Sequence, residues 1–147
     1  MDEIRPRLFL GPLQAAYLDD ELRRNSVTHV LNLSCVKYSE REFVKSYRAV
    51  HLDDTPDSDL MAVLPKCLGF IGKSLAEGGS VLVHCVAGKS RSASVVAAWV
   101  MATESLSADI AIAEVQAAHP RADPNSGFRA ALHRFQEQLL STAAVAV

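Results

Sequence analysis

Cys85, Arg91 and Ser92 have the spacing most suggestive of chemistry, within "VLVHCVAGKSRSASVV" at residues 81–96. An apolar segment leads into the cysteine, and the arginine and serine follow six and seven residues later. A cysteine thiolate is a strong nucleophile, and the planar guanidinium of an arginine can hold two oxygens of a phosphoryl group at once. The spacing therefore predicts a nucleophilic cysteine and an arginine that face the same anion.

The residues between Cys85 and Arg91 form a loop rich in small side chains, with Gly88 near its centre. Such a loop can curl tightly and turn its backbone N–H groups inward, and the N-terminus of a helix expected from about Ser92 adds partial positive charge. This charge favours a bound phosphate and also a cysteine thiolate. Lys89 either strengthens the positive field or faces solvent. The predicted phosphate-binding residues are Val86, Ala87, Gly88, Lys89, Ser90 and Arg91.

Two neighbouring residues have predicted supporting roles. The Ser92 hydroxyl can donate a hydrogen bond to the Cys85 sulfur and help it leave in a second chemical step; the alternative is that Ser92 only caps its helix. The His84 ring can orient the loop through hydrogen bonds to the backbone, or it is a structural histidine with no chemical role.

A departing alkoxide or phenolate needs a proton, and the acidic loop at residues 53–63 offers carboxyl groups for this task. One protonated carboxyl group would act as general acid and then as the base for an incoming water. The residues by themselves leave the choice among four open. The candidates are Asp53, Asp54, Asp57 and Asp59.

The pattern of apolar residues and turn formers predicts the elements that position these groups. Strands are expected at 7–11, 27–33, 47–53 and 80–84. Helices are expected at 13–25, 64–77, 92–103, 107–119 and 128–139, with one or two further helical turns in 39–47. Alternating strands and helices predict an α/β fold with a mainly parallel central sheet flanked by helices on both faces. Ligands of such folds bind beyond the carboxyl ends of the strands, where Cys85 lies.

Composition places the chain among ordinary globular domains. Its 147 residues are 49% hydrophobic and 22% charged, with a formal net charge of -2, so nothing in the overall charge attracts nucleic acid or an anionic membrane. We expect a single domain over 1–147 with a loosely ordered tail at about 141–147. The sequence predicts no signal peptide, no myristoylation motif and no membrane-spanning run. We expect a monomer in the cytoplasm that can also enter the nucleus. We expect it to bind neither nucleic acid nor a membrane.

The three cysteines predict neither a disulfide framework nor a zinc ribbon, because their number is odd and no CxxC spacing occurs. Cys35 and Cys67 are expected in the core, and a redox partnership of either one with Cys85 stays open. The remaining histidines share no metal-like spacing, so no metal site is predicted. They are His29, His51, His119 and His133.

Through the segment "HCVAGKSRS", the chain resembles the small, atypical dual-specificity protein phosphatases of the cysteine-based tyrosine phosphatase superfamily. The family pattern His-Cys-x5-Arg-Ser/Thr matches residues 84–92, and "IRPRLFLGPLQAAYL" and "VTHVLNLS" are similar to the family's opening elements. "HPRADPNSGFRAAL" is similar to the segment before the last helix, usually Arg-Pro-x-x-Asn-Pro-x-x-Gly-Phe. His119 and Asp123 depart from that segment.

The resemblance implies a phosphotyrosine protein phosphatase-like fold with the phosphate-binding loop between a central strand and a helix. It also implies hydrolysis of phosphotyrosine and phosphoserine/threonine in proteins through a cysteinyl-phosphate, with no metal and no cofactor. The family's general acid lies some 31 residues before the nucleophile, which selects Asp54 and leaves Asp53 as its rival. Two alternatives are a phosphatase of phosphoinositides, phosphoglucans or RNA 5′-phosphates, and a phospho-residue binding module without turnover.

Overall fold

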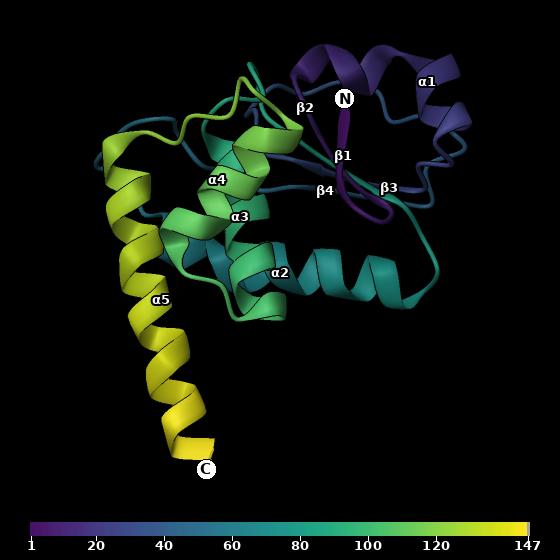
Figure 1. Ribbon diagram of the computed structural model, residues 1–147. Coiled ribbons are helices and arrows are strands. Elements are labelled where there is room, and N and C mark those ends of the chain that lie inside the picture. The colour runs from purple at the N-terminus through teal and green to yellow at the C-terminus, as the bar shows by residue number, and fades with distance from the viewer. Residues whose placement is uncertain (147) are drawn as a thin grey trace.

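The computed structural model describes residues 1–146, and the side chains of residues 1–143 (Figure 1). The strands are β1 Asp2–Arg5, β2 Leu8–Gly11, β3 His29–Asn32, β4 Ser46–Ala49 and β5 Val81–His84. The helices are the 3-10 helix η1 Leu13–Tyr17 and the α-helices α1 Asp19–Arg24, α2 Leu60–Ala76, α3 Arg91–Glu104, α4 Ala108–Ala118 and α5 Ser126–Ala146.

The strands form one sheet in the order β1-β2-β5-β3-β4, with β5 at its centre. β2 and β3 both pair parallel with β5, and β4 pairs parallel with β3. Gly11 and Asn32 lie opposite His84, so the segments that follow three strands meet at one edge of the sheet. The prediction of a mainly parallel sheet is confirmed. The antiparallel edge strand β1 was not predicted, because only Ile4 of its residues is buried.

Each face of the sheet is covered, because successive side chains of a strand point to opposite sides. In β5, Val81 and Val83 belong to the large core formed with α2 to α5, whereas Leu82 belongs to a smaller core formed with η1 and α1. Figure 1 shows the short N-terminal helices on one side of the sheet and the longer helices on the other. The predicted helical cover on both faces is therefore confirmed.

Several predicted helices have different bounds in the structure, and the last one, expected at 128–139, extends over Ser126–Ala146. The helix expected at 13–25 is divided at Leu18 into η1 and α1. The helix expected from 64 begins at Leu60, because the Asp59 carboxylate accepts a hydrogen bond from Ala62 N at 3.1 Å and caps the first turn. Pro65 consequently lies inside α2 and not in its first turn.

The helical turns expected within 39–47 are absent from this described segment. Residues 42 and 43 form a turn, and β4 begins at Ser46. Phe43 and Val44 instead pack against the smaller core, which holds this segment in an irregular path. The tail expected at 141–147 stays a prediction: α5 continues to Ala146, and Val147 lies outside the described residues.

Within residues 1–146, no single helix combines the length and the apolar composition needed to cross a bilayer. The pair α3 and α4 meets this criterion together by length and composition alone, with a bend of 120° between the two helices.

Candidate active site

Cys85 lies directly after the central strand β5, and α3 begins six residues later at Arg91. The thiol is buried, and its Sγ is 3.1 Å from Oγ of Ser92, whose side chain is also buried. Ser90 and not Ser92 occupies the N-cap position of α3. The alternative that Ser92 serves only as a helix cap is therefore wrong, and its hydroxyl is free to interact with the sulfur.

Gly88 allows the loop to pass close to the end of β2. Its φ of 66° lies in the left-handed region, and a Cβ atom at this position would lie 2.8 Å from the carbonyl carbon of Gly11 and from Pro12 N. Both facts exclude larger side chains here without a backbone shift. The tight curl predicted from the small residues is present.

Backbone carbonyls of the loop bind to segments outside it. Val86 O accepts a hydrogen bond from Leu13 N at 3.0 Å, and Lys89 O accepts one from Asp123 N at 2.7 Å. These two bonds hold the loop against η1 and against the segment before α5. The Lys89 side chain is exposed, so it lies at the border of the site.

His119 supports the loop from behind, a contact that the sequence did not predict. Its buried ring places Nε2 2.7 Å from Gly88 O and Nδ1 2.6 Å from the Asp2 carboxylate. The resemblance had pointed to an arginine at this position. His119, at a position where the family usually has an arginine, therefore connects the phosphate-binding loop to β1.

The Arg91 guanidinium is half-buried at the start of α3. Its Nη1 donates to Leu52 O at 3.1 Å, which fixes the direction of the side chain. Among the described residues, Arg91 Nε is buried and has no hydrogen-bond partner. Buried N–H groups without partners are rare and costly, so this atom indicates a ligand that accepts its hydrogen bond.

His84 is fully buried and its ring binds on both sides. Nδ1 lies 3.2 Å from Cys85 O, and Nε2 lies 2.7 Å from the Tyr38 hydroxyl. Burial lowers the pKa of His84 to about 4 and raises the pKa of Tyr38. The ring is therefore neutral near pH 7, and its partners assign Nδ1–H as donor to the carbonyl and the Tyr38 O–H as donor to Nε2.

Asp54 is tied to the phosphate-binding loop through Asn125. Asn125 Nδ2 donates to the Asp54 carboxylate at 2.9 Å, while its backbone N–H donates to Ser90 Oγ at 2.9 Å. Asn125 Oδ1 also accepts from Phe128 N at 2.8 Å, as at a helix N-cap, so the start of α5 holds it in place. The only sequence signal for Asn125 was its place beside the family's Gly-Phe pair.

The other three acidic candidates have different surroundings. Asp53 lies 3.6 Å from His51 Nε2, and Asp59 caps α2. Asp57 is exposed, and a hydrogen bond from Thr55 lowers its pKa. Asp54 lines a cavity of about 390 Å³ that it shares with Lys89, Ser90 and Asn125. It is the one of the four with a hydrogen bond to a residue that contacts the phosphate-binding loop.

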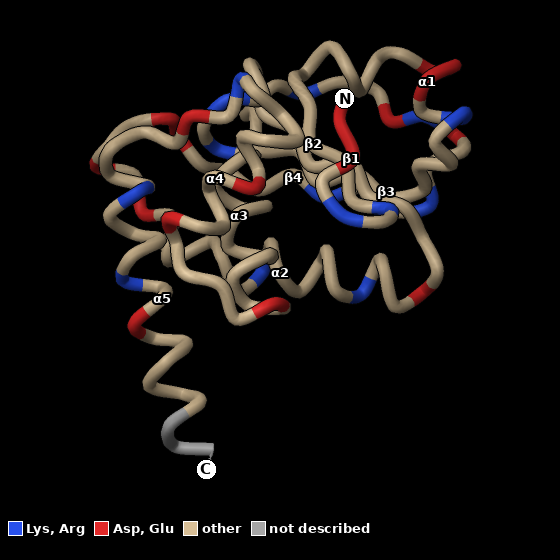
Figure 2. The backbone as a smooth tube through the Cα atoms, in the orientation of Figure 1, with Lys and Arg blue, Asp and Glu red and all other residues tan. Residues whose placement is uncertain are grey.

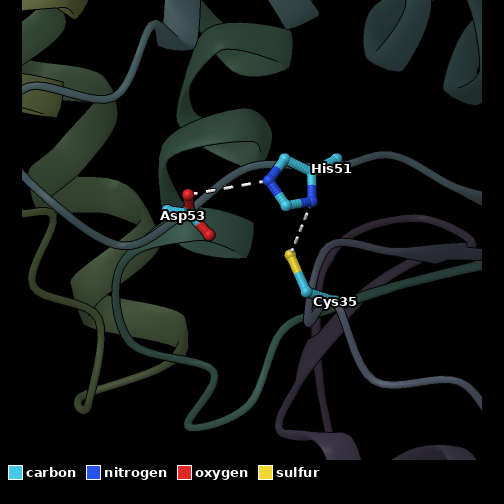
Figure 3. A group of neighbouring side chains, drawn as sticks. All are labelled: Cys35, His51 and Asp53. Carbon is cyan, nitrogen blue, oxygen red and sulfur yellow. Dashed lines mark hydrogen bonds and ion pairs between the residues drawn. The ribbon is translucent and has the colours of Figure 1, made fainter.

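Cys35 is exposed, so the prediction that it belongs to the core is wrong. It follows β3 at the sheet edge where the site lies, and its φ of 63° is left-handed. Its sulfur lies 3.5 Å from His51 Nδ1. Figure 3 shows the thiol of Cys35 pointing toward the His51 ring. Cys67 is buried in α2 as expected, and burial raises the pKa of its thiol to about 12.

The comparisons with known proteins agree with this geometry. The family model described as "Dual specificity phosphatase, catalytic domain" matches residues 8–138. The chain therefore belongs to the family of dual-specificity phosphatase catalytic domains, which confirms the resemblance inferred from its sequence.

Individual relatives are similar over most of this chain. Dual specificity protein phosphatase 19 of Mus musculus is 36% identical over 136 residues, which are 90% of this chain and 60% of the relative. Dual specificity protein phosphatase 12 of Rattus norvegicus is 39% identical over 133 residues, 86% of this chain and 38% of the relative. The chain thus spans between about two fifths and three fifths of the length of these curated relatives.

Solved structures show the same fold. The crystal structure of human DUSP28 has a TM-score of 0.89 at 34% identity, covering 97% of this chain and 99% of that one. A human tyrosine phosphatase-like serine/threonine/tyrosine-interacting protein also has a TM-score of 0.89, at 32% identity, covering 95% of this chain and 97% of that one. The predicted phosphatase-like fold is confirmed.

Proposed function

We propose that this chain removes phosphate from phosphotyrosine and phosphoserine/threonine in proteins through a cysteinyl-phosphate intermediate. One observation carries the proposal: the buried Cys85 sulfur lies 3.1 Å from the Ser92 hydroxyl, and the buried Nε of the preceding Arg91 has no hydrogen-bond partner among the described residues. A phosphate bound in the loop would supply that partner. Family membership over residues 8–138 supports the same activity.

In the first step, the Cys85 thiolate attacks the phosphorus and forms an S–P bond while the bond to the leaving oxygen breaks. The Asp54 carboxyl group gives its proton to that oxygen. Arg91, through Nε and a terminal N–H, holds two equatorial oxygens, and the loop N–H groups bind the rest of the spreading charge. Cys85, Arg91 and Asp54 are the proposed catalytic residues of this step.

In the second step, a water molecule attacks the phosphorus and the Asp54 carboxylate takes its proton. The S–P bond breaks, and the electron pair returns to sulfur. Ser92 is proposed as a catalytic residue here, because a hydroxyl at 3.1 Å can donate a hydrogen bond to the departing thiolate. His84 is proposed as a supporting residue that orients the Cys85 carbonyl through Nδ1.

Asp54 is preferred to Asp53 as general acid because of its neighbours. The Asn125 side-chain amide donates to the Asp54 carboxylate, and the Asn125 backbone N–H donates to Ser90 Oγ of the phosphate-binding loop. Asp53 faces His51 instead. The assignment made by counting from the nucleophile thus has independent support in the hydrogen bonds.

We propose a phosphorylated protein as the partner, and a cytoplasmic monomer with access to the nucleus as the working form. Figure 2 shows acidic and basic residues spread along the chain, and the formal net charge is -2. Such a distribution gives little attraction for RNA or for an anionic membrane. Phosphoinositides in a membrane and RNA 5′-phosphates are therefore less favoured substrates.

A binding module without turnover is the second candidate, because one structural relative is named only phosphatase-like. The proposed nucleophile, arginine and acid are all in place here, which favours turnover. Hydrolysis of para-nitrophenyl phosphate in the presence of a chelator tests the choice. We expect turnover by the natural chain and none by Cys85→Ser. Equal rates for both proteins, or no hydrolysis by either, would overturn the proposal.

The substrate class is tested with phosphotyrosine and phosphothreonine peptides, a phosphoinositide and a 5′-phosphorylated RNA under the same conditions. We expect both peptides to be hydrolysed with a higher kcat/KM than the lipid and the RNA. A higher value for either of the latter two would reassign the substrate.

A further inference from the structure

Cys35, His51 and Asp53 form a cluster that has no part in the proposed mechanism (Figure 3). The sulfur lies 3.5 Å from His51 Nδ1, and His51 Nε2 lies 3.6 Å from the Asp53 carboxylate. One ligand atom from each residue falls within 4.8 Å of the other two. Three groups able to bind a metal thus converge at one point of the surface.

The types of donor atom indicate which ion would fit. A thiolate, an imidazole and a carboxylate together favour a borderline ion such as Zn²⁺, whereas Mg²⁺ and Ca²⁺ prefer oxygen ligands alone. Zinc sits about 2.0 to 2.3 Å from such ligands in a tetrahedral arrangement. All three side chains are exposed, and their ligand atoms lie within 4.8 Å of one another. A small closing movement would bring one ring nitrogen, the sulfur and a carboxylate oxygen to those distances from one ion. Water would take the fourth position.

The cluster adjoins the candidate active site. Leu52 O accepts hydrogen bonds from Arg91 Nη1 at 3.1 Å and from the Cys35 thiol at 3.5 Å. Arg91 Nη1 also lies 3.9 Å from the Cys35 sulfur. A metal ion bound here would therefore contact the segment that holds the arginine and that leads into Asp54.

We propose that Cys35, His51 and Asp53 bind a zinc ion, and that its occupancy slows turnover at Cys85. Binding forms a Zn–S bond and releases the thiol proton to solvent. The ion then joins the segment after β3 to residues 51–53, which restrains the approach of the neighbouring Asp54 to a substrate. The effect on turnover rests on the proposed function, whereas the binding itself does not.

Cobalt(II) is a suitable probe, because a thiolate bound to it gives an intense charge-transfer absorption in the near ultraviolet. Titration of the Cys85→Ser chain removes the proposed nucleophile as a competing ligand. We expect one equivalent of cobalt to produce the band and zinc to displace it. We expect no band after the further change Cys35→Ser, and weaker binding after His51→Ala.

His133→Ala is the matched control, since His133 pairs with Asp109 on the surface without a cysteine nearby. This variant should keep the band. Thermal unfolding curves establish that each variant is folded. A band that survives Cys35→Ser, or a Cys85→Ser chain that gives none at millimolar cobalt, would overturn the zinc site.

The effect on turnover is measured as the ratio of rates with and without zinc for each protein separately. We expect a several-fold decrease for the natural chain and little change for Cys35→Ser. Equal inhibition of both would overturn the regulatory part, because zinc would then act at the phosphate pocket. If the natural chain hydrolyses no phosphate at all, the proposed function fails while the cobalt result still decides the site.

Discussion

At the scale of single residues, the candidate site is defined by which polar atoms have partners and which do not. The neutral His84 ring is satisfied on both sides, and the Asp54 carboxylate is held by Asn125. Arg91 Nε alone is buried without a partner among the described residues. The unsatisfied donor is thus available to a bound ligand, while the satisfied groups hold the other side chains of the site in place.

Arg91→Lys tests the role of the guanidinium. Lysine keeps the charge but loses the planar fork that binds two oxygens, so we expect kcat/KM to fall about a hundredfold or more. Steady-state kinetics with para-nitrophenyl phosphate measures the change. Arg134→Lys, on the exposed face of α5, is the control and should leave the rate unchanged. A fully active Arg91→Lys chain would contradict the proposed phosphate contact.

Asp54→Asn tests the proton donor. We expect hydrolysis of phenyl phosphate to slow by about a hundredfold, the lower range for loss of general acid catalysis, because phenolate leaves poorly without a proton. An ester with a more acidic leaving group should be affected much less. Asp53→Asn is the comparison variant, and kcat is measured for both variants with both esters. The assignment is off by one residue if Asp53→Asn has the larger effect on phenyl phosphate.

At the scale of elements, the site is assembled where the loop after β5 meets the start of α5 and the acidic loop. Gly127 is the close point of this contact, because a Cβ atom built on it would clash with Pro56 O. The acidic loop can therefore lie against α5 only where a glycine stands. Asn125, two residues earlier, then reaches Asp54.

Gly127→Ala tests this contact between elements. The added methyl group must push Pro56 and its loop away, so we expect a loss of the Asn125–Asp54 hydrogen bond and a fall in kcat for phenyl phosphate. Thermal unfolding should also shift to lower temperature. Gly69→Ala is a matched control in α2, since nothing lies within 4 Å of its Cβ position and alanine favours a helix. Unchanged kcat in Gly127→Ala would show that the loop accommodates the methyl group.

At the scale of the whole molecule, the chemistry depends on a sheet covered on both faces. The central strand β5 is buried throughout, so the turn after it is held between the two cores. The same burial isolates His84 from water and lowers its pKa to about 4. Stability of the fold is therefore linked to the protonation state of this ring.

The pH dependence of unfolding tests that link. Because the pKa of His84 is lower in the folded chain than its usual 6.5, protonation favours the unfolded chain. The contribution is fully present above about pH 6.5 and is lost as the pH falls toward 4, by about 3 kcal/mol in total. Urea unfolding of the natural chain and of His84→Gln across this range should show a steeper decline for the natural chain. Parallel declines would mean that His84 is not protected from protonation.

The sequence by itself determined the local features of this protein. The nucleophile, the arginine and the loop between them lie within one strand-loop-helix unit, so their spacing predicts their arrangement. The alternation of strands and helices likewise predicts the α/β fold, because burial on two faces leaves a periodic pattern of apolar residues.

Only the tertiary structure decided the contacts between distant segments. Asn125 with Asp54, and His119 with Gly88, are separated by 71 and 31 residues. Cys35 was expected in the core because an isolated cysteine usually packs there, yet it lies at the surface beside His51. Such contacts depend on how whole helices and strands pack against one another. The order of residues along the chain does not by itself specify that packing.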